Sequence, residues 1–141
     1  MGTICFVILN YKTWREAAAC AESILKTQQG QDIRIVLVDN GSGNGSEESL
    51  REEFAGEKRV HVIASEKNLG FARGNNLGIR YARSHFEPDF IVAANSDIIF
   101  EQEDYCEKLR EIYKEERFDI LGGMQAAPDI LIRWRETGST R

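Results

Sequence analysis

The chain has 141 residues, enough for one domain with a buried core and too few for a second domain of ordinary size. Its net charge of −5 and the lack of a Lys/Arg run argue against a nucleic-acid-binding surface. No apolar stretch approaches the roughly 20 residues that cross a bilayer, and residues 1–9 lack the basic start of a secretion signal. We therefore expect a cytoplasmic protein, with peripheral contact at the inner face of the membrane as an alternative.

Five short apolar runs, rich in β-branched residues, predict buried strands over residues 4–9, 33–38, 60–64, 90–94 and 120–123. The segments between them have helical spacing and predict helices over 13–25, 46–54, 73–85 and 103–116. The first helix begins with Thr13-Trp14-Arg15-Glu16, the pattern of a capping box in which the threonine hydroxyl binds a free amide. The alternation predicts an α/β fold, an open, mostly parallel twisted sheet flanked by helices.

Cysteine and histidine are too dispersed to predict a metal or redox centre. Cys5, Cys20 and Cys106 lack the paired spacing of zinc and redox motifs, and we expect reduced thiols that fill the core. His61 and His85 are far apart in the sequence and are expected to have structural roles.

Polar residues follow three of the predicted strands. Asn10 and Tyr11 follow the first, Asp39 and Asn40 the second, and Asn95-Ser96-Asp97 the fourth. Ligands of open α/β sheets bind beyond the carboxyl ends of the parallel strands. We therefore expect these side chains to face one crevice.

The loop from Asp39 to Ser46 contains three glycines in five positions, which allow the backbone to approach a ligand. Asp39 can accept a hydrogen bond from the imide N–H of uracil or thymine, a donor that cytosine lacks. The alternative is an ordinary strand-to-helix loop in which Asp and Asn form turns. The glycines do not match G-x-G-x-x-G and follow the second strand, so a nicotinamide or flavin site is not favoured.

The segment 68–78 carries three glycines, Gly70, Gly74 and Gly78, which recur every four residues. On a helix they share one face and allow either close packing against the sheet or room for a ligand. Arg73 would lie in the first helical turn, where it and the helix N-terminus can face a diphosphate, with amide donors nearby on Asn75–Asn76. The alternative is an exposed arginine beside tightly packed glycines.

Asn95-Ser96-Asp97 is the strongest chemical signal. Mg²⁺ and Mn²⁺ take one or two carboxylates together with phosphate oxygens and water. Asp97 would be the only anionic ligand from this motif, and Asn95 can order a ribose hydroxyl or a metal-bound water. An aspartate that ends a strand and caps a turn is the alternative.

Together these segments resemble the donor-binding half of the family 2 glycosyltransferases with the GT-A fold, in particular a bacterial rhamnosyltransferase-like branch. The similarity runs from residues 8–11 through 38–42 and 68–76 to 95–97. It implies a Rossmann-like sheet that binds a UDP- or dTDP-sugar, with a divalent cation (Mg²⁺ or Mn²⁺) on Asp97. The residues to which the resemblance assigns nucleotide binding are Asn10, Tyr11, Asp39, Asn40, Asn68, Gly70, Arg73, Asn76 and Asn95.

The chain departs from the family pattern in two places. Asn95 stands where the family's D-x-D element has its first acid. Beyond residue 124 the chain contains Asp129 and Glu136 but no Glu-Asp pair in the family's context, so the catalytic residues are unknown. We expect one nucleotide-sugar-binding domain over 1–141. Residues 1–100 would form the donor-binding core, 101–141 a helix, a strand and a tail, and the acceptor-binding half would be absent.

The leading hypothesis is sugar transfer from a UDP- or dTDP-sugar to a saccharide or lipid-linked acceptor, with inversion at the anomeric carbon, as in bacterial polysaccharide biosynthesis. The missing base favours an alternative, a non-catalytic nucleotide-sugar-binding or assembly module. A nucleotidyltransferase is disfavoured because the loop 10–14 has no glycine. Without its acceptor half the sheet would expose an apolar edge, and we expect self-association, through the segment 130–134.

Overall fold

The computed structural model describes residues 2–117, 120–124 and 127–134. The chain separates into two compact units, residues 1–101 and 102–141. Each unit is described by itself below.

The first unit alternates strands and helices in the order β1 (Ile4–Asn10), α1 (Trp14–Thr27), β2 (Ile33–Asn40), α2 (Ser46–Glu53), β3 (Val60–Ser65), α3 (Phe71–Phe86) and β4 (Phe90–Asn95). The strands pair in the order β3-β2-β1-β4 and all are parallel, which confirms the predicted open α/β sheet. Each strand extends one or two residues beyond its predicted end. Asn10, Asp39, Asn40 and Asn95 therefore belong to the strands themselves and not to the loops that follow.

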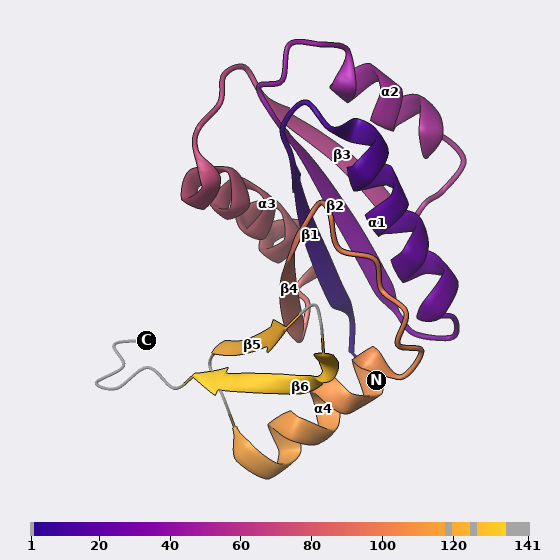
Figure 1. Cartoon of the computed structure of the whole chain (residues 1–141), viewed down its shortest axis with the longest axis vertical. Helices are drawn as coiled ribbons and strands as arrows, with labels where there is room; N and C mark the ends of the chain where they lie inside the picture. Colours follow the sequence, from indigo (N-terminus) through magenta and orange to yellow (C-terminus); the bar gives the residue numbers. More distant parts are fainter. Residues whose placement is uncertain (1, 118–119, 125–126, 135–141) are drawn as a thin grey trace. The chain divides into compact units, whose positions relative to one another are not determined.

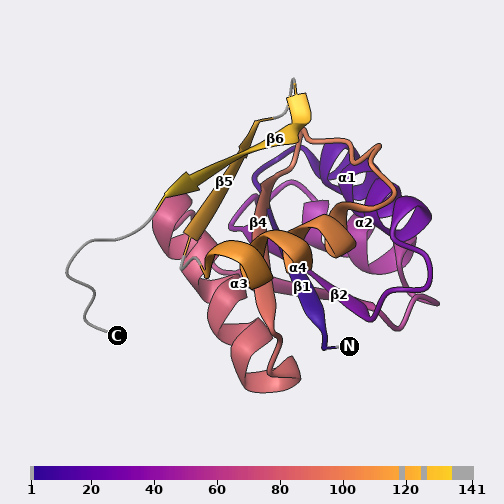
Figure 2. The same cartoon turned by 90° about the horizontal axis from the view of Figure 1, so that it is seen from below.

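The two faces of the sheet carry different helices. Figures 1 and 2 show α1 and α2 on one face and α3 on the other. β4 lies on the far side of β1 from β2, so the crossover through α3 runs back across the sheet. A right-handed crossover in that direction places its helix on the opposite face. The chain thus reverses its winding between β1 and β4, where sheets of this kind bind ligands.

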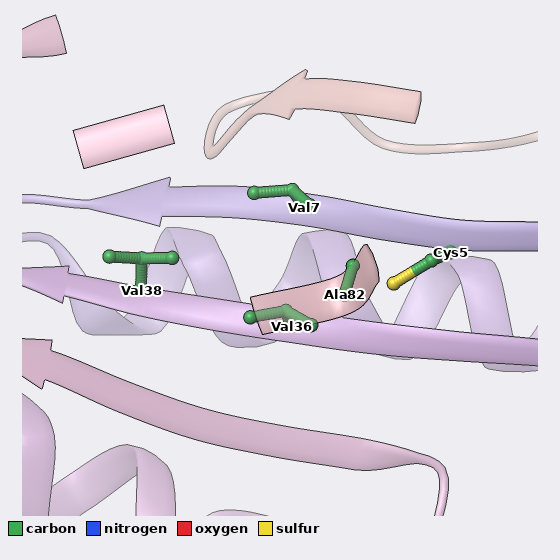
Figure 3. Packing of buried hydrophobic residues seen from close by; sticks show 5 residues of the cluster. All are labelled: Cys5, Val7, Val36, Val38 and Ala82. Carbon is green, nitrogen blue, oxygen red and sulfur yellow. The ribbon is translucent and has the colours of Figure 1, made fainter. Parts of the chain in front are cut away.

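The face under α3 is closely packed. Cys5, Val7, Val36, Val38 and Ala82 form a fully buried cluster there (Figure 3). Two glycines of α3 bring the helix against it: a Cβ at Gly78 would lie 2.5 Å from Val7 Cγ1, and one at Gly74 would lie 2.7 Å from Leu9 Cδ1. Close helix–sheet packing is thus the correct interpretation for these two glycines. Gly70 is different, because it precedes the helix with a φ of 86°.

The start of α1 corrects one prediction. The Thr13 side chain makes no capping hydrogen bond to the helix, so the predicted capping box is wrong. Its hydroxyl is instead 3.5 Å from Asn10 Oδ1, and the same oxygen accepts the Thr13 backbone N–H at 3.2 Å. Both the backbone N–H and the hydroxyl of Thr13 thus donate to Asn10 at the end of β1. Glu16 is exposed in the first turn.

The second unit contains α4 (Tyr105–Glu116), β5 (Ile120–Met124) and β6 (Ala127–Trp134). β5 and β6 pair antiparallel as a two-stranded sheet, so the prediction that residues 120–123 join the parallel sheet is wrong. Only two residues separate the strands in sequence, and so short a connection permits antiparallel pairing alone. β6 was not predicted, and Pro128 lies in it. The last residues of the predicted tail, 135–141, lie outside the described residues.

Cysteine and histidine have structural roles, as predicted. All three cysteines are free and buried, and burial raises the pKa of Cys5 and of Cys20 to about 12. These thiols therefore stay protonated at neutral pH. His61 packs 4.7 Å from Phe86 between ring centroids. Among the residues that the structure describes, no helix has both the length and the apolar character that a membrane span requires.

Candidate functional site

The carboxyl edge of the sheet gathers most of the predicted polar residues. The pairing of β1 with β2 places Asn10 beside Asp39, and the pairing of β1 with β4 places Leu9 beside Asn95. Parallel strands all end at this edge, so residues far apart in the sequence become neighbours. The strand ends meet at one edge, as predicted, but their side chains do not all face one crevice, since Asn40 is turned to the loop before α3.

Asp39 is buried and held by two donors. It is only 4% exposed, and Asn10, which is fully buried, donates from Nδ2 to Asp39 Oδ1 at 3.1 Å. The Ser42 hydroxyl donates to the same oxygen. Among the described residues Asp39 Oδ2 has no hydrogen-bond partner. A fixed carboxylate with one uncommitted oxygen can accept a hydrogen bond from a ligand.

The Asn40 side chain is buried and makes its contacts within the protein. It is 2% exposed, and its side chain holds the loop before α3. Nδ2 donates to Asn68 Oδ1 at 3.0 Å and to the Gly70 carbonyl at 3.2 Å, while Oδ1 accepts the Leu69 N–H at 2.9 Å. Both amide protons are therefore used within the protein. Asn68 is exposed, and its Oδ1 also accepts the Gly70 N–H at 2.8 Å.

An open depression of about 310 Å³ lies where β1 and β4 end. Two predicted residues, Asn95 and Asp97, line it. The other residues that line it are Leu9, Glu16, Phe71, Asn75 and Ser96. The sequence analysis assigned no binding role to Glu16 or Phe71. Their position in the first turns of α1 and α3 was the available signal, because both turns begin at the carboxyl edge of the sheet.

Arg73 and Asn76 do not line this depression. Both side chains are exposed, and within the described part of the chain neither side chain forms a hydrogen bond or an ion pair. They are three residues apart on α3 and share one face of it, whereas Phe71 and Asn75 share the face at the depression. Arg73 does lie in the first turn of α3, as predicted. Tyr11 is also outside the depression and is 42% exposed, with Lys12 Nζ 5.2 Å from its ring centroid.

The acidic groups at the depression fit a cation that arrives with a phosphate-bearing ligand. No three His, Cys, Asp or Glu side chains gather closely enough to hold a metal ion, considering only the described residues. Asp97 is exposed, and its charge adds to burial in raising the pKa of Cys20, whose thiol donates to the Asn95 carbonyl at 3.8 Å. Hard cations such as Mg²⁺ bind through one or two carboxylates plus phosphate oxygens. Asp97, with Glu16 on the same depression, supplies that kind of set.

A parallel sheet whose strand order reverses between β1 and β4, with helices on both faces, defines the class of open, doubly wound α/β proteins. The sequence matches the family described as Glycosyl transferase family 2 over residues 5–138. This match spans nearly the whole chain. The protein therefore belongs to glycosyl transferase family 2.

Two curated relatives are named as a glycosyltransferase and a hexosyltransferase. The chain is 33% identical over 120 residues to "Glycosyltransferase GlyG" of Streptococcus pneumoniae serotype 4, a match that covers 85% of this chain and 38% of the relative. It is 28% identical over 133 residues to "Low-salt glycan biosynthesis hexosyltransferase Agl10" of Haloferax volcanii, covering 94% of this chain and 38% of the relative. The chain thus spans 38% of the length of each of these relatives.

Solved structures share the fold. The mannosyltransferase PcManGT from Pyrobaculum calidifontis, in complex with GDP-Man and Mn²⁺, matches with a TM-score of 0.71 and 14% identity, over 83% of this chain and 34% of that one. S. aureus TarS 1-349 in complex with UDP matches with a TM-score of 0.66 and 18% identity, over 83% of this chain and 33% of that one. These likenesses establish the GT-A fold.

Proposed function

We propose that this chain is the donor-binding part of an inverting glycosyltransferase that uses a UDP- or dTDP-sugar. The observation that carries the proposal is the buried Asp39 carboxylate, held through Oδ1 with Oδ2 uncommitted, near an open depression lined by Asp97. The first group can recognise a base and the second can bind a metal-complexed diphosphate. Both lie at the edge of the sheet where this class of fold binds ligands.

The base is assigned to Asp39 and Tyr11. Uracil and thymine each present an imide N–H that Asp39 Oδ2 can accept, and the exposed Tyr11 ring can contact the flat face of the base. Asn10 contributes indirectly, because its amide orients the carboxylate. Asn40, Asn68 and Gly70 are assigned to the loop that leads into α3 instead of to the nucleotide. This assignment revises the predicted role of these three residues.

The diphosphate is assigned to the depression and to the start of α3. Asp97 would hold the divalent cation, and Asn95 would order a ribose hydroxyl or a metal-bound water. The cation would stabilise the negative charge that the diphosphate gains as it leaves. Arg73 and Asn76, exposed and uncommitted at the start of α3, can contact the diphosphate from another side. The helix N-terminus favours an anion at that place.

In the transfer step, an acceptor hydroxyl of a saccharide or lipid-linked acceptor loses its proton to a base and attacks the anomeric carbon opposite the diphosphate. The bond from that carbon to the diphosphate oxygen breaks, the nucleoside diphosphate leaves, and the configuration inverts. The residues described here supply the donor side of this step. The rhamnosyltransferase-like specificity, the acceptor, self-association and the cytoplasmic location stay predictions.

The test is a calorimetric titration of UDP, dTDP and GDP into the chain, with Mn²⁺ or with EDTA. We expect UDP or dTDP to bind in the presence of Mn²⁺, and Asp97→Asn to remove the dependence on the metal. Asp89→Asn is the matched control, because Asp89 precedes β4 at the opposite end of the strand and is also exposed. Absence of binding by both UDP and dTDP, whether or not GDP binds, or metal-dependent binding that Asp97→Asn leaves unchanged, would contradict the proposal.

The non-catalytic alternative makes a separate prediction. A binding or assembly module would take up the nucleotide-sugar and release it intact. A transferase part that activates its donor would release free nucleoside diphosphate from a bound UDP-sugar, by transfer to an acceptor or to water. Chromatography of the nucleotides after incubation with Mn²⁺ separates the two outcomes.

A further inference from the structure

The loop after β1 contains a backbone conformation that its sequence disfavours. Lys12 has a φ of 64°, in the left-handed region. Within the described residues, Glu87 is the only other residue besides glycine with a positive φ. A side chain with a Cβ is crowded in this conformation, so surrounding contacts must hold it. Lys12 directly follows Tyr11, to which we assign the base.

Two side chains from the loop after β2 hold the peptide groups on both sides of Lys12. Ser42 Oγ accepts the Lys12 N–H at 2.7 Å. Asn44 Nδ2 donates to the Lys12 carbonyl oxygen at 3.3 Å. Together they fix the orientation of the peptide planes before and after Lys12, which is what defines its φ and ψ.

Both side chains are themselves anchored. Ser42 is 5% exposed, and its hydroxyl proton is donated to Asp39 Oδ1. Asn44 Oδ1 accepts the backbone N–H of Ser46 at 3.2 Å and its hydroxyl at 2.6 Å, and Ser46 is the first residue of α2. Ser42 thus connects the Lys12 N–H to the Asp39 carboxylate, and Asn44 connects the Lys12 carbonyl to the start of α2.

The ends of the same turn are fixed by Asn10. Its Nδ2 donates to Asp39 Oδ1 at 3.1 Å, and its Oδ1 accepts the Thr13 N–H at 3.2 Å. Tyr11 therefore lies in a four-residue turn whose two ends and centre are all connected, by hydrogen bonds, to Asp39 or its neighbours. The Tyr11 side chain itself is free enough to be 42% exposed.

We propose that Ser42 and Asn44 are positioning residues for the nucleotide base. They hold Lys12 in the left-handed conformation and so keep Tyr11 at a fixed position relative to Asp39. This inference rests on the proposed function, in which Tyr11 and Asp39 contact a base that carries an imide N–H. Neither Ser42 nor Asn44 needs to touch the nucleotide. Their effect on binding passes through the backbone of Lys12.

The test is a double-mutant cycle between Asn44 and Lys12. Asn44→Ala removes one support without changing a contact of Asp39, and we expect it to weaken binding of UDP or dTDP about fivefold. Glycine adopts positive φ without strain, so Lys12→Gly makes the support unnecessary. In the Lys12→Gly background, Asn44→Ala should change the affinity by less than about twofold.

A second readout needs no nucleotide. The Lys12 amide proton, bonded to Ser42, should exchange slowly with solvent in the wild-type chain and much faster in Ser42→Ala.

Glu87→Gly is the control for the binding measurements. It relieves the other left-handed residue, which follows the C-terminal end of α3, and should leave nucleotide binding unchanged.

The outcomes separate this inference from the function on which it rests. If the wild-type chain binds UDP or dTDP and Asn44→Ala binds equally well, the positioning role is wrong and the proposed function stands. The positioning role is also wrong if Asn44→Ala weakens binding equally with and without the Lys12→Gly change, since the effect then does not pass through Lys12. If the wild-type chain binds no nucleotide, both proposals are wrong, whatever the exchange of the Lys12 amide.

Discussion

Two groups of polar residues lie at the carboxyl edge of the sheet, and they differ in burial. Asn10, Asp39 and Asn40 end β1 and β2, are 4% exposed or less, and use their side chains on one another and on the adjoining loops. The side chains of Arg73 and Asp97 are exposed and form no hydrogen bond or ion pair with the rest of the described chain. A buried polar group must be satisfied within the protein, whereas an exposed one can exchange water for a ligand.

Polarity at a strand end therefore does not by itself indicate ligand binding. The last residues of the two central strands, β1 and β2, are buried, so a polar side chain there first has to satisfy its own hydrogen bonds, whereas Asn95 at the end of β4 is exposed. Substitutions in the buried group should lower the stability of the fold. Those in the exposed group should change binding and leave the fold intact.

The largest effect is expected for Asn40→Ala. The change removes the hydrogen bonds from the buried Asn40 to Asn68, Leu69 and Gly70, which hold the loop before α3. We expect the free energy of unfolding to fall by about 3 kcal/mol, measured by urea denaturation. Asn76→Ala, the exposed counterpart, should change it by less than about 0.5 kcal/mol. Similar losses in the two variants would mean that burial does not distinguish the groups.

Gly78→Ala probes the packing that brings α3 to this edge. An added Cβ would meet Val7 Cγ1 at 2.5 Å and Val38 Cγ2 at 2.8 Å. The resulting displacement should cost about 2 kcal/mol, more than alanine gains over glycine through helix propensity. Thermal unfolding of Gly78→Ala and of Gly56→Ala, where a Cβ would meet nothing within 4 Å, gives the comparison. A stabilised Gly78→Ala variant would show that the helix can move away freely.

Asp39→Asn distinguishes the contribution of the Asp39 side chain to stability, through Oδ1, from its proposed contribution to base binding, through Oδ2. The amide oxygen can keep the hydrogen bonds from Asn10 and Ser42, while the uncommitted oxygen becomes an NH₂ donor. We expect affinity for UDP or dTDP to fall about tenfold, corresponding to about 1.4 kcal/mol, with a smaller change in stability. Calorimetric titration and urea denaturation of the same preparation measure both. Unchanged affinity would remove Asp39 from base recognition.

The smallest effect is expected on the outer surfaces of the helices, at Glu22. Burial, and then the hydrogen bond and charge of Glu53, raise the pKa of Glu22 above its ordinary value of 4.5. Because this pKa is higher in the folded than in the unfolded state, Glu22 increases the free energy of unfolding below pH 4.5. That contribution is lost as the pH rises through the folded-state pKa. Glu22→Gln should therefore be more stable than the wild type at neutral pH, by less than about 1 kcal/mol.

Glu57→Gln should change the free energy of unfolding at neutral pH in the opposite direction. The hydrogen bond from Arg59 lowers the pKa of Glu57 from 4.5 to about 2, so its contribution is present above pH 4.5 and lost as the pH falls towards 2. This variant should be less stable than the wild type at neutral pH. Thermal unfolding across the acidic range measures both variants, and shifts of the same sign would contradict the assignment.

Much of the fold could be predicted from local sequence signals. Buried parallel strands are short apolar runs of β-branched residues, and all four strands of the parallel sheet were predicted within two residues of their ends. The spacing of four placed the glycines of α3 on one helix face and left close packing or room for a ligand as the two interpretations, of which the structure shows close packing at Gly74 and Gly78. The order of the polar strand ends then carried the family resemblance and the convergence at one edge.

The site itself required three-dimensional contacts. Asn40 and Asp97 are both polar residues at the ends of strands, and only the packing of α3 and its preceding loop shows that the first is enclosed and the second exposed. Glu16 and Phe71 reach the depression because α1 and α3 begin at the same edge.

The succession of helices and strands from β1 to β5 follows from the sequence alone, since helix and strand periodicity depend on neighbours along the chain, whereas β6 was not predicted. The pairing of β5 with β6, the contact of Asn10 with Thr13, and the hold of Ser42 and Asn44 on Lys12 became visible only in three dimensions. Two of these, the β5–β6 pairing and the contact between Asn10 and Thr13, involve residues close in sequence, yet each depends on a geometry that residue type alone does not specify. The third joins residues about thirty positions apart, which come together only because β1 and β2 lie side by side in the sheet.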